Sequence, residues 1–135
     1  MLSGITIFAL LCFFAASVGN GEETKAENPQ IAHPEWYIKV TEWSILNARG
    51  VAVIHHVMIE NTGDVTYKNP RVLVRYYSNE YGSNGVQVAV ERGVLPVTLP
   101  PRSKKVYLKG GATLGAITGN VDARELEVLG AVVVQ

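Results

Sequence analysis

Three side chains with metal-binding donor atoms lie close together near the middle of the chain: His55, His56 and Met58. Imidazole nitrogen and thioether sulfur together form a donor set that suits copper. Adjacent residues of a regular strand point to opposite faces, so His56 and Met58 share a face and His55 does not. One interpretation is an outward copper site formed by His56, Met58 and His33. The other is structural, with His55 at the edge of the core and His56 on the surface.

Motifs typical of enzyme active sites are missing from the sequence. It contains no GxSxG or HExxH motif, and its single cysteine, Cys12, lies in an N-terminal apolar run. Lys and Arg total 12 and so do Asp and Glu, which leaves no net positive charge to attract nucleic acid. We therefore expect a protein that is not an enzyme, has no cofactor apart from the copper alternative, and binds no nucleic acid.

The first 19 residues predict export from the cytoplasm. They carry no charged side chain, and residues 5–16 are almost wholly apolar. Small residues around Ser17 and Gly19 fit a signal-peptide cleavage site. An uncleaved segment would instead anchor the chain, although it is shorter than the roughly 20 residues a membrane helix prefers. Both alternatives predict an extracytoplasmic protein, periplasmic or secreted, and the second adds membrane association.

Residues 20–34 predict a flexible linker, because they combine charged residues and two prolines with few apolar side chains. The remaining residues, 35–135, are enough for a single domain. Runs of β-branched and aromatic residues alternate there with turn residues such as Ala48, Arg49 and Gly50. The predicted strands cover residues 36–44, 51–60, 71–78, 86–91, 104–109 and 125–134. This pattern is typical of an all-β fold, an immunoglobulin- or fibronectin-like antiparallel β-sandwich of about six or seven strands.

The period-two pattern of the two central strands predicts which side chains face the core. The inward set is Val51, Val53, His55, Val57, Ile59, Asn61, Val72, Val74 and Tyr76. The outward set then includes Ile54, Met58, Leu73 and Tyr77. If the two strands are neighbours, these four side chains form an apolar patch of the kind that binds a partner. Alternatively, the linker or the stems of arginine side chains cover them.

A family resemblance rests on two segments of this region. Residues 57–77 read VMIENTGDVTYKNPRVLVRYY, with Asn61 able to bond the turn, and residues 99–108 read LPPRSKKVYL. Together they resemble the bacterial FxLYD-type domains. The resemblance implies a small extracytoplasmic sandwich, often a lipoprotein or tethered to the membrane, with no assigned catalytic residues.

The C-terminal stretch, residues 126–134, is apolar at nearly every position. Such a strand should be covered on both faces, so we expect it to be central in its sheet or paired with another chain. Strand addition by a partner and homodimerisation both fit. The partner-binding residues predicted here are Leu126, Val128, Val132 and Val134.

The sequence thus favours a non-catalytic binding or scaffold module, an accessory or structural subunit of an envelope-associated protein complex. One alternative is a soluble periplasmic ligand-binding module with copper as its ligand. The other is an adhesion or filament component that uses the apolar C-terminal strand.

Overall fold

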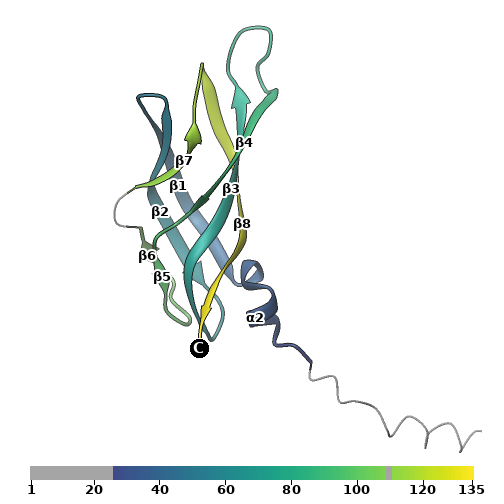
Figure 1. The fold of residues 1–135 in the computed structure, drawn as a ribbon, viewed down its shortest axis with the longest axis vertical. Coiled ribbons are helices and arrows are strands. Elements are labelled where there is room, and N and C mark those ends of the chain that lie inside the picture. The colour runs from purple at the N-terminus through teal and green to yellow at the C-terminus, as the bar shows by residue number, and fades with distance from the viewer. Residues whose placement is uncertain (1–25, 109–110) are drawn as a thin grey trace, which may run out of the picture.

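The computed structural model describes residues 26–108 and 111–135 (Figure 1). The signal peptide or anchor predicted for residues 1–19 lies outside these ranges. The described elements are α2 (Pro29–Ala32), the 3-10 turn η2 (Pro34–Trp36), β1 (Ile38–Ala48), β2 (Val51–Asn61), β3 (Thr66–Ser78), β4 (Gln87–Val94), β5 (Thr98–Leu99), β6 (Val106–Tyr107), β7 (Ala112–Ala116) and β8 (Val121–Val134). No helix in the described ranges is long and apolar enough to span a membrane.

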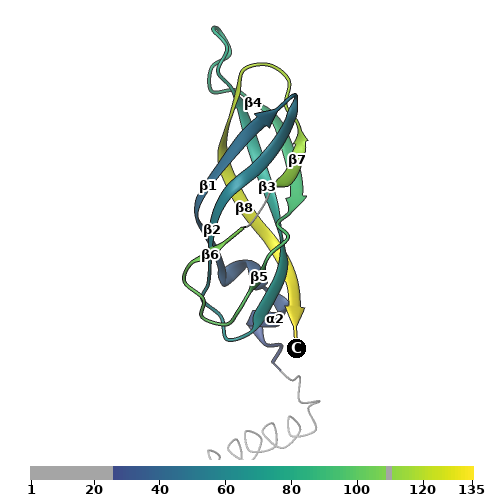
Figure 2. The same cartoon turned by 90° about the vertical axis from the view of Figure 1, so that its left-hand side faces the viewer.

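The strands form two antiparallel sheets that pack face to face, which confirms the predicted all-β sandwich (Figures 1 and 2). In the first, sheet A, β2 pairs with β1 on one side and with β6 and β7 on the other. In the second, sheet B, β3 pairs with β8 on one side and with β4 and β5 on the other. The two central strands, β2 and β3, therefore belong to different sheets.

A two-residue turn joins β1 to β2. Ala48 pairs with Val51, and the residues between them, Arg49 and Gly50, have φ of 54° and 86°. Positive φ at both positions is the geometry that matches the twist of an antiparallel hairpin. The side-chain oxygen of Asn47 accepts a hydrogen bond from the Gly50 amide at 2.8 Å, which holds the turn that the sequence predicted.

A β-bulge interrupts β2 and changes the face that its side chains occupy. Ser44 of β1 pairs with His56 and Ile45 pairs with Ile54, so His55 is an extra residue on β2. Ile54 and Val57 are both buried, whereas His55 and His56 between them are both exposed. One inserted residue shifts the inward and outward alternation by one position.

The predicted faces of β2 are accordingly right after the bulge and wrong before it. The inward side chains after the bulge are Val57, Ile59 and Asn61, as predicted. Before it the alternation is reversed: Ile54, predicted outside, is fully buried, while Val51, predicted inside, is 39% exposed. In β3, the inward side chains are Val72, Val74 and Tyr76, again as predicted.

The side chain of Asn61 links two connections at one end of the sandwich through hydrogen bonds. Its side-chain NH2 donates to the carbonyl oxygens of Val65 at 2.8 Å, Leu99 at 3.1 Å and Pro100 at 3.0 Å, and its side-chain oxygen accepts from the Gly63 amide at 2.8 Å. The side chain is buried, with 1% of its surface exposed. The predicted bonding of the turn by Asn61 therefore extends to a second connection, the one that follows β5.

Residues 29–36 form two short helical turns, so the predicted linker, 20–34, has defined local structure in its second half. Residues 20–25 of that prediction lie outside the described residues. The Asn28 side chain caps α2 through the Gln30 amide at 3.0 Å, and the Tyr67 hydroxyl donates to the Gln30 carbonyl at 2.8 Å. Pro34 is buried, and η2 contacts both β1 and β8. The composition of this segment is typical of a linker. The contacts that order it are with residues distant in the sequence, and composition does not reveal such contacts.

The two lateral sides of the sandwich differ. On one side β4 contacts β7, so the two sheets close on each other. A Cβ added to Gly93 of β4 would overlap the Leu114 side chain of β7, which shows how tightly this side is packed. On the other side lie β1 and β8, which contact each other less extensively than β4 and β7 do and leave a cavity between them. We call these the closed side and the open side.

Candidate functional site

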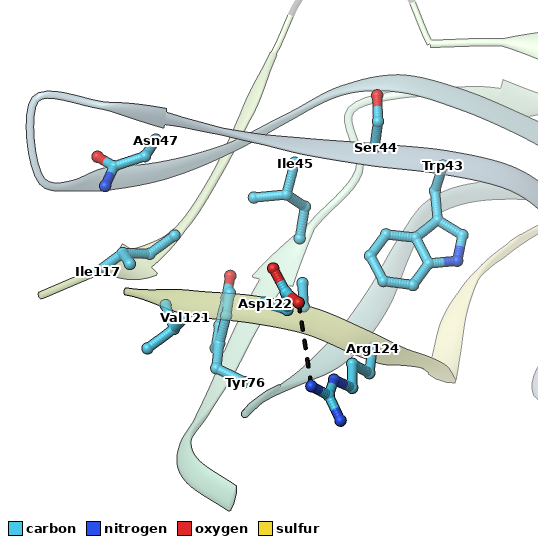
Figure 3. A pocket seen from close by; sticks show the side chains of 10 residues that line it. Trp43, Ser44, Ile45, Asn47, Tyr76, Ile117, Val121, Asp122 and Arg124 are labelled. Carbon is cyan, nitrogen blue, oxygen red and sulfur yellow. Dashed lines mark ion pairs between the residues drawn. The ribbon is translucent and has the colours of Figure 1, made fainter. Parts of the chain in front are cut away.

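A cavity lies on the open side, between β1 and β8 (Figure 3). It has a volume of about 400 Å³. We call it the edge cleft (Figure 3). Its lining comes from β1, β3, β8 and the segment between β7 and β8, with Trp43, Ile45, Tyr76, Ile117, Val121 and Ala123 as the apolar and aromatic members. The volume is within the range of ligand-binding pockets.

Side chains on the inner face of β1 form one wall of the edge cleft. Trp43 and Ile45 point from β1 toward β8, whereas Ser44 points away (Figure 3). Trp43 and Ile45 pack against the core but stay partly exposed. They are exposed because β1 is an edge strand and has no neighbour in sheet A to cover its open flank.

Tyr76 lies deep in the edge cleft, on the central strand β3. Its hydroxyl donates to the Leu114 carbonyl at 3.3 Å, and only 2% of its surface is exposed. Burial, with a smaller contribution from the Glu91 carboxylate, raises the pKa of Tyr76 to about 12. The phenol therefore stays protonated and neutral at physiological pH, as a structural donor.

Charged groups at the rim of the edge cleft are engaged with one another. The Arg124 guanidinium lies 4.0 Å from the Asp122 carboxylate. It also donates to the side-chain oxygens of Asn79 at 3.1 Å and Asn84 at 3.3 Å, and lies 5.5 Å from the centre of the Tyr77 ring. Such mutual pairing leaves little net charge at the rim of a cleft whose lining is both polar and apolar.

The two strands that flank the edge cleft have free backbone edges. Within the described ranges, β1 forms its ladder with β2 alone and β8 forms its ladder with β3 alone. Every second residue of an edge strand directs its N–H and C=O away from its partner strand. Over the 11 residues of β1 and the 14 of β8, these groups can accept an added strand.

The apolar patch predicted from Ile54, Met58, Leu73 and Tyr77 does not exist. Ile54 is in the core, and Met58 is on the outer face of sheet A. Leu73 and Tyr77 are on the outer face of sheet B, where Leu73 is 7% exposed and Tyr77 lies beneath Arg124. The prediction assumed that β2 and β3 are neighbours, but they lie in different sheets.

The predicted C-terminal residues separate into two faces of β8. Leu126 and Val128 pack against the core, whereas Val132 and Val134 are 57% and 44% exposed. β8 is an edge strand of sheet B, so the expectation of a central strand covered on both faces is wrong for the chain alone. This stretch therefore carries apolar side chains on both faces of β8, although only one face is covered within the described residues.

The three residues of the predicted copper site are not brought together. His33 stacks on Trp36 at 4.0 Å between ring centres, and its Nδ1 lies 3.0 Å from a Glu35 carboxylate oxygen. His56 pairs with Ser44 of β1. Ser44 is six residues, or about 20 Å, along the strand from Ile38, where β1 begins after the turn that contains His33. In the part of the chain that the structure describes, no three His, Cys, Asp or Glu side chains are placed to hold a metal ion.

Four residues that line the edge cleft were not predicted from the sequence: Trp43, Ile45, Val121 and Ala123. Their apolar alternation was visible, but it is equally typical of side chains at the centre of a sandwich. Their exposure depends on which strands are at the edges, and the local sequence does not contain that information.

No family model, curated protein or solved structure matches this chain. The resemblance to FxLYD-type domains therefore stays a prediction from the sequence.

Proposed function

We propose that this chain is a non-catalytic, extracytoplasmic scaffold module, an accessory or structural subunit of an envelope-associated complex. Its partner adds an extended segment along the open side, between β1 and β8. The observation that carries the proposal is the edge cleft of about 400 Å³, which is flanked by two free strand edges.

The combination of a cleft of mixed polar and apolar lining with free strand edges favours an extended peptide over a compact small molecule. A strand that enters the cleft can pair its backbone with β1 or β8, which satisfies N–H and C=O groups along its length. Its alternate side chains then point inward, toward Trp43 and Ile45. Backbone pairing supplies affinity, and the fit of the inward side chains supplies specificity.

The state of the polar groups supports binding and not catalysis. The Tyr76 hydroxyl is bonded to a main-chain carbonyl and its pKa is raised to about 12 by burial, so it is poorly suited to proton transfer at neutral pH. Asp122 and Arg124 at the rim lie within ion-pair distance of each other. These groups shape the cleft and hold its wall.

Two features of the sequence support the proposed location. Residues 5–16 form the apolar run of a signal peptide or anchor, and the chain resembles extracytoplasmic domains that are often tethered to membranes. Membrane association would then come from the N-terminal segment, and the open side would remain available to a protein partner.

The test is mild detergent extraction of native envelopes, followed by size separation and mass spectrometry of whatever travels with the protein. Ala123→Trp fills the edge cleft, and Val90→Trp places the same bulk on the exposed face of β4, on the closed side, as a matched control. We expect the wild type and Val90→Trp to migrate with a large assembly and Ala123→Trp to be released from it. Thermal unfolding of each purified variant verifies that it is folded.

Two outcomes would contradict the proposal. Migration of the wild type as a single copy would exclude a stable subunit role. Retention of Ala123→Trp in the assembly would show that the edge cleft is not the attachment site.

A further inference from the structure

The bulge in β2 places two histidines side by side on the outer face of sheet A. His55 and His56 lie between the buried Ile54 and Val57, and both imidazoles are exposed. In a regular strand one of them would point into the core, as the sequence predicted. The inserted residue turns both outward, opposite Ser44 of β1.

Met58 is the next outward residue of the same strand. It follows His56 by two positions and is partly exposed, so its thioether shares the face of both imidazoles. Its cross-strand neighbours are Glu42 on β1 and Tyr107 on β6. The three donors therefore lie on one strand segment, flanked on either side by a neighbouring strand.

The surrounding side chains complete a polar and aromatic rim. The Ser44 hydroxyl lies 3.4 Å from His55 Nδ1, and a Glu42 carboxylate oxygen lies 3.9 Å from His56 Nε2. The ring centres of His56 and Tyr107 are 6.4 Å apart. A carboxylate and an aromatic ring beside the donors would both attract a monovalent cation, the first through its charge and the second through its π-face.

We propose that this face binds a single Cu(I) ion through the two imidazoles of His55 and His56 and the thioether of Met58. Thioether ligands select soft Cu(I), and imidazole is also a good copper ligand. Both histidines bind in the neutral form, with one ring nitrogen available to the metal. The site is independent of the edge cleft, because its ligands lie on the outer face of sheet A, whereas Trp43 and Ile45 point from the inner face of that sheet into the cleft.

The experiment is an anaerobic competition between the protein carrying Cys12→Ser and the chromophoric Cu(I) chelator bicinchoninate, with ascorbate as reductant. Cys12→Ser removes the only thiol, which would itself bind Cu(I), and is present in every protein compared. We expect one Cu(I) per chain. His55→Ala and Met58→Leu should each weaken binding about tenfold or more, because each removes one donor. His33→Ala is the matched control: it removes an exposed histidine outside the site and should bind as the wild type does.

A second measurement reports the thioether directly and does not depend on redox chemistry. The chain has two methionines, Met1 and Met58, so methyl-labelled methionine gives an NMR signal for Met58 that Met58→Leu identifies. Addition of Ag(I), a redox-inert substitute for Cu(I), should shift this signal until one equivalent is bound.

Three results would overturn the proposal. They are failure of the folded wild type to compete for Cu(I), equal affinity of Met58→Leu and wild type, and loss of binding in His33→Ala. The variants change exposed or partly exposed side chains, and matching circular dichroism spectra confirm that each has kept its fold.

Discussion

The closed and open sides of this sandwich are built from the same kinds of residue but have different surroundings. On the closed side Leu114 of β7 is fully buried against β4, and Gly93 has no space for a further carbon atom. On the open side Trp43 and Ile45 face a cleft of about 400 Å³. The difference shows that one flank of the core is tightly packed, whereas the other contains a cavity.

The segment that precedes β1 supports this view of the open side. It enters as the turn η2, which contacts both β1 and β8 and buries Pro34. The chain thus covers part of its own open flank with a non-strand segment and leaves the edge cleft uncovered. An added strand would extend the same cover along the flank.

The largest predicted difference comes from truncating one apolar side chain on each side. Leu114→Ala should lower the free energy of unfolding by about 2–5 kcal/mol, because it opens a cavity in a closed core. Ile45→Ala should lower it by only about 1–2 kcal/mol, because Ile45 is partly exposed in the native state. Urea denaturation measures both. Equal losses would contradict the distinction between the sides.

A smaller difference is predicted for substitutions that add atoms. Gly93→Ala should destabilise by about 1–3 kcal/mol, since its Cβ overlaps Leu114 and the backbone must shift. Ala123→Val should change stability by less than about 0.5 kcal/mol, because the added methyl groups enter open space. Thermal melts of the two proteins test this directly. A destabilised Ala123→Val would mean that the edge cleft is closed in solution.

The features that depend on local sequence pattern were predictable. The inward alternation of Val72, Val74 and Tyr76 and the side-chain bonding of Asn61 follow from strand periodicity and turn chemistry, and the structure contains both. The faces of β2 before His55 were predicted wrongly, because the bulge inserts one residue and reverses the inward and outward alternation, and the two-residue pattern of the sequence does not reveal a bulge.

The candidate site was not predictable, for a different reason. Trp43 and Ala123 are about 80 residues apart in the sequence and meet only because sheet A and sheet B place β1 and β8 on the same side. Strand order is a property of the whole fold. The apolar character of β8 was recognised, but its edge position was not.

The smallest predicted effect on stability concerns an ion pair at the end of the sandwich where Asn61 lies. The Asp64 carboxylate lies 2.7 Å from Arg102 Nε, and this bond lowers the pKa of Asp64 below its ordinary value of 3.8. The stabilisation is present above pH 3.8 and is lost as the pH falls through the lowered pKa. Asp64→Asn should remove a small part of the acid sensitivity below pH 3.8, as measured by denaturation at a series of pH values.

The matched control for this prediction is Asp122→Asn at the rim of the edge cleft, where the distance to Arg124 is 4.0 Å. We expect it to leave the acid limb of the stability curve closer to that of the wild type. A larger change from Asp122→Asn than from Asp64→Asn would reverse the ranking of the two ion pairs.

The central claim is that a partner strand occupies the open side, and hydrogen exchange measured by mass spectrometry tests it most directly. The isolated protein is compared with the same protein in the assembly extracted from native envelopes. We predict that amides of β1 and β8 exchange about tenfold or more slowly in the assembly, while those of β4 and β7 change little. Unchanged exchange along β1 and β8, or protection confined to the closed side, would contradict the account.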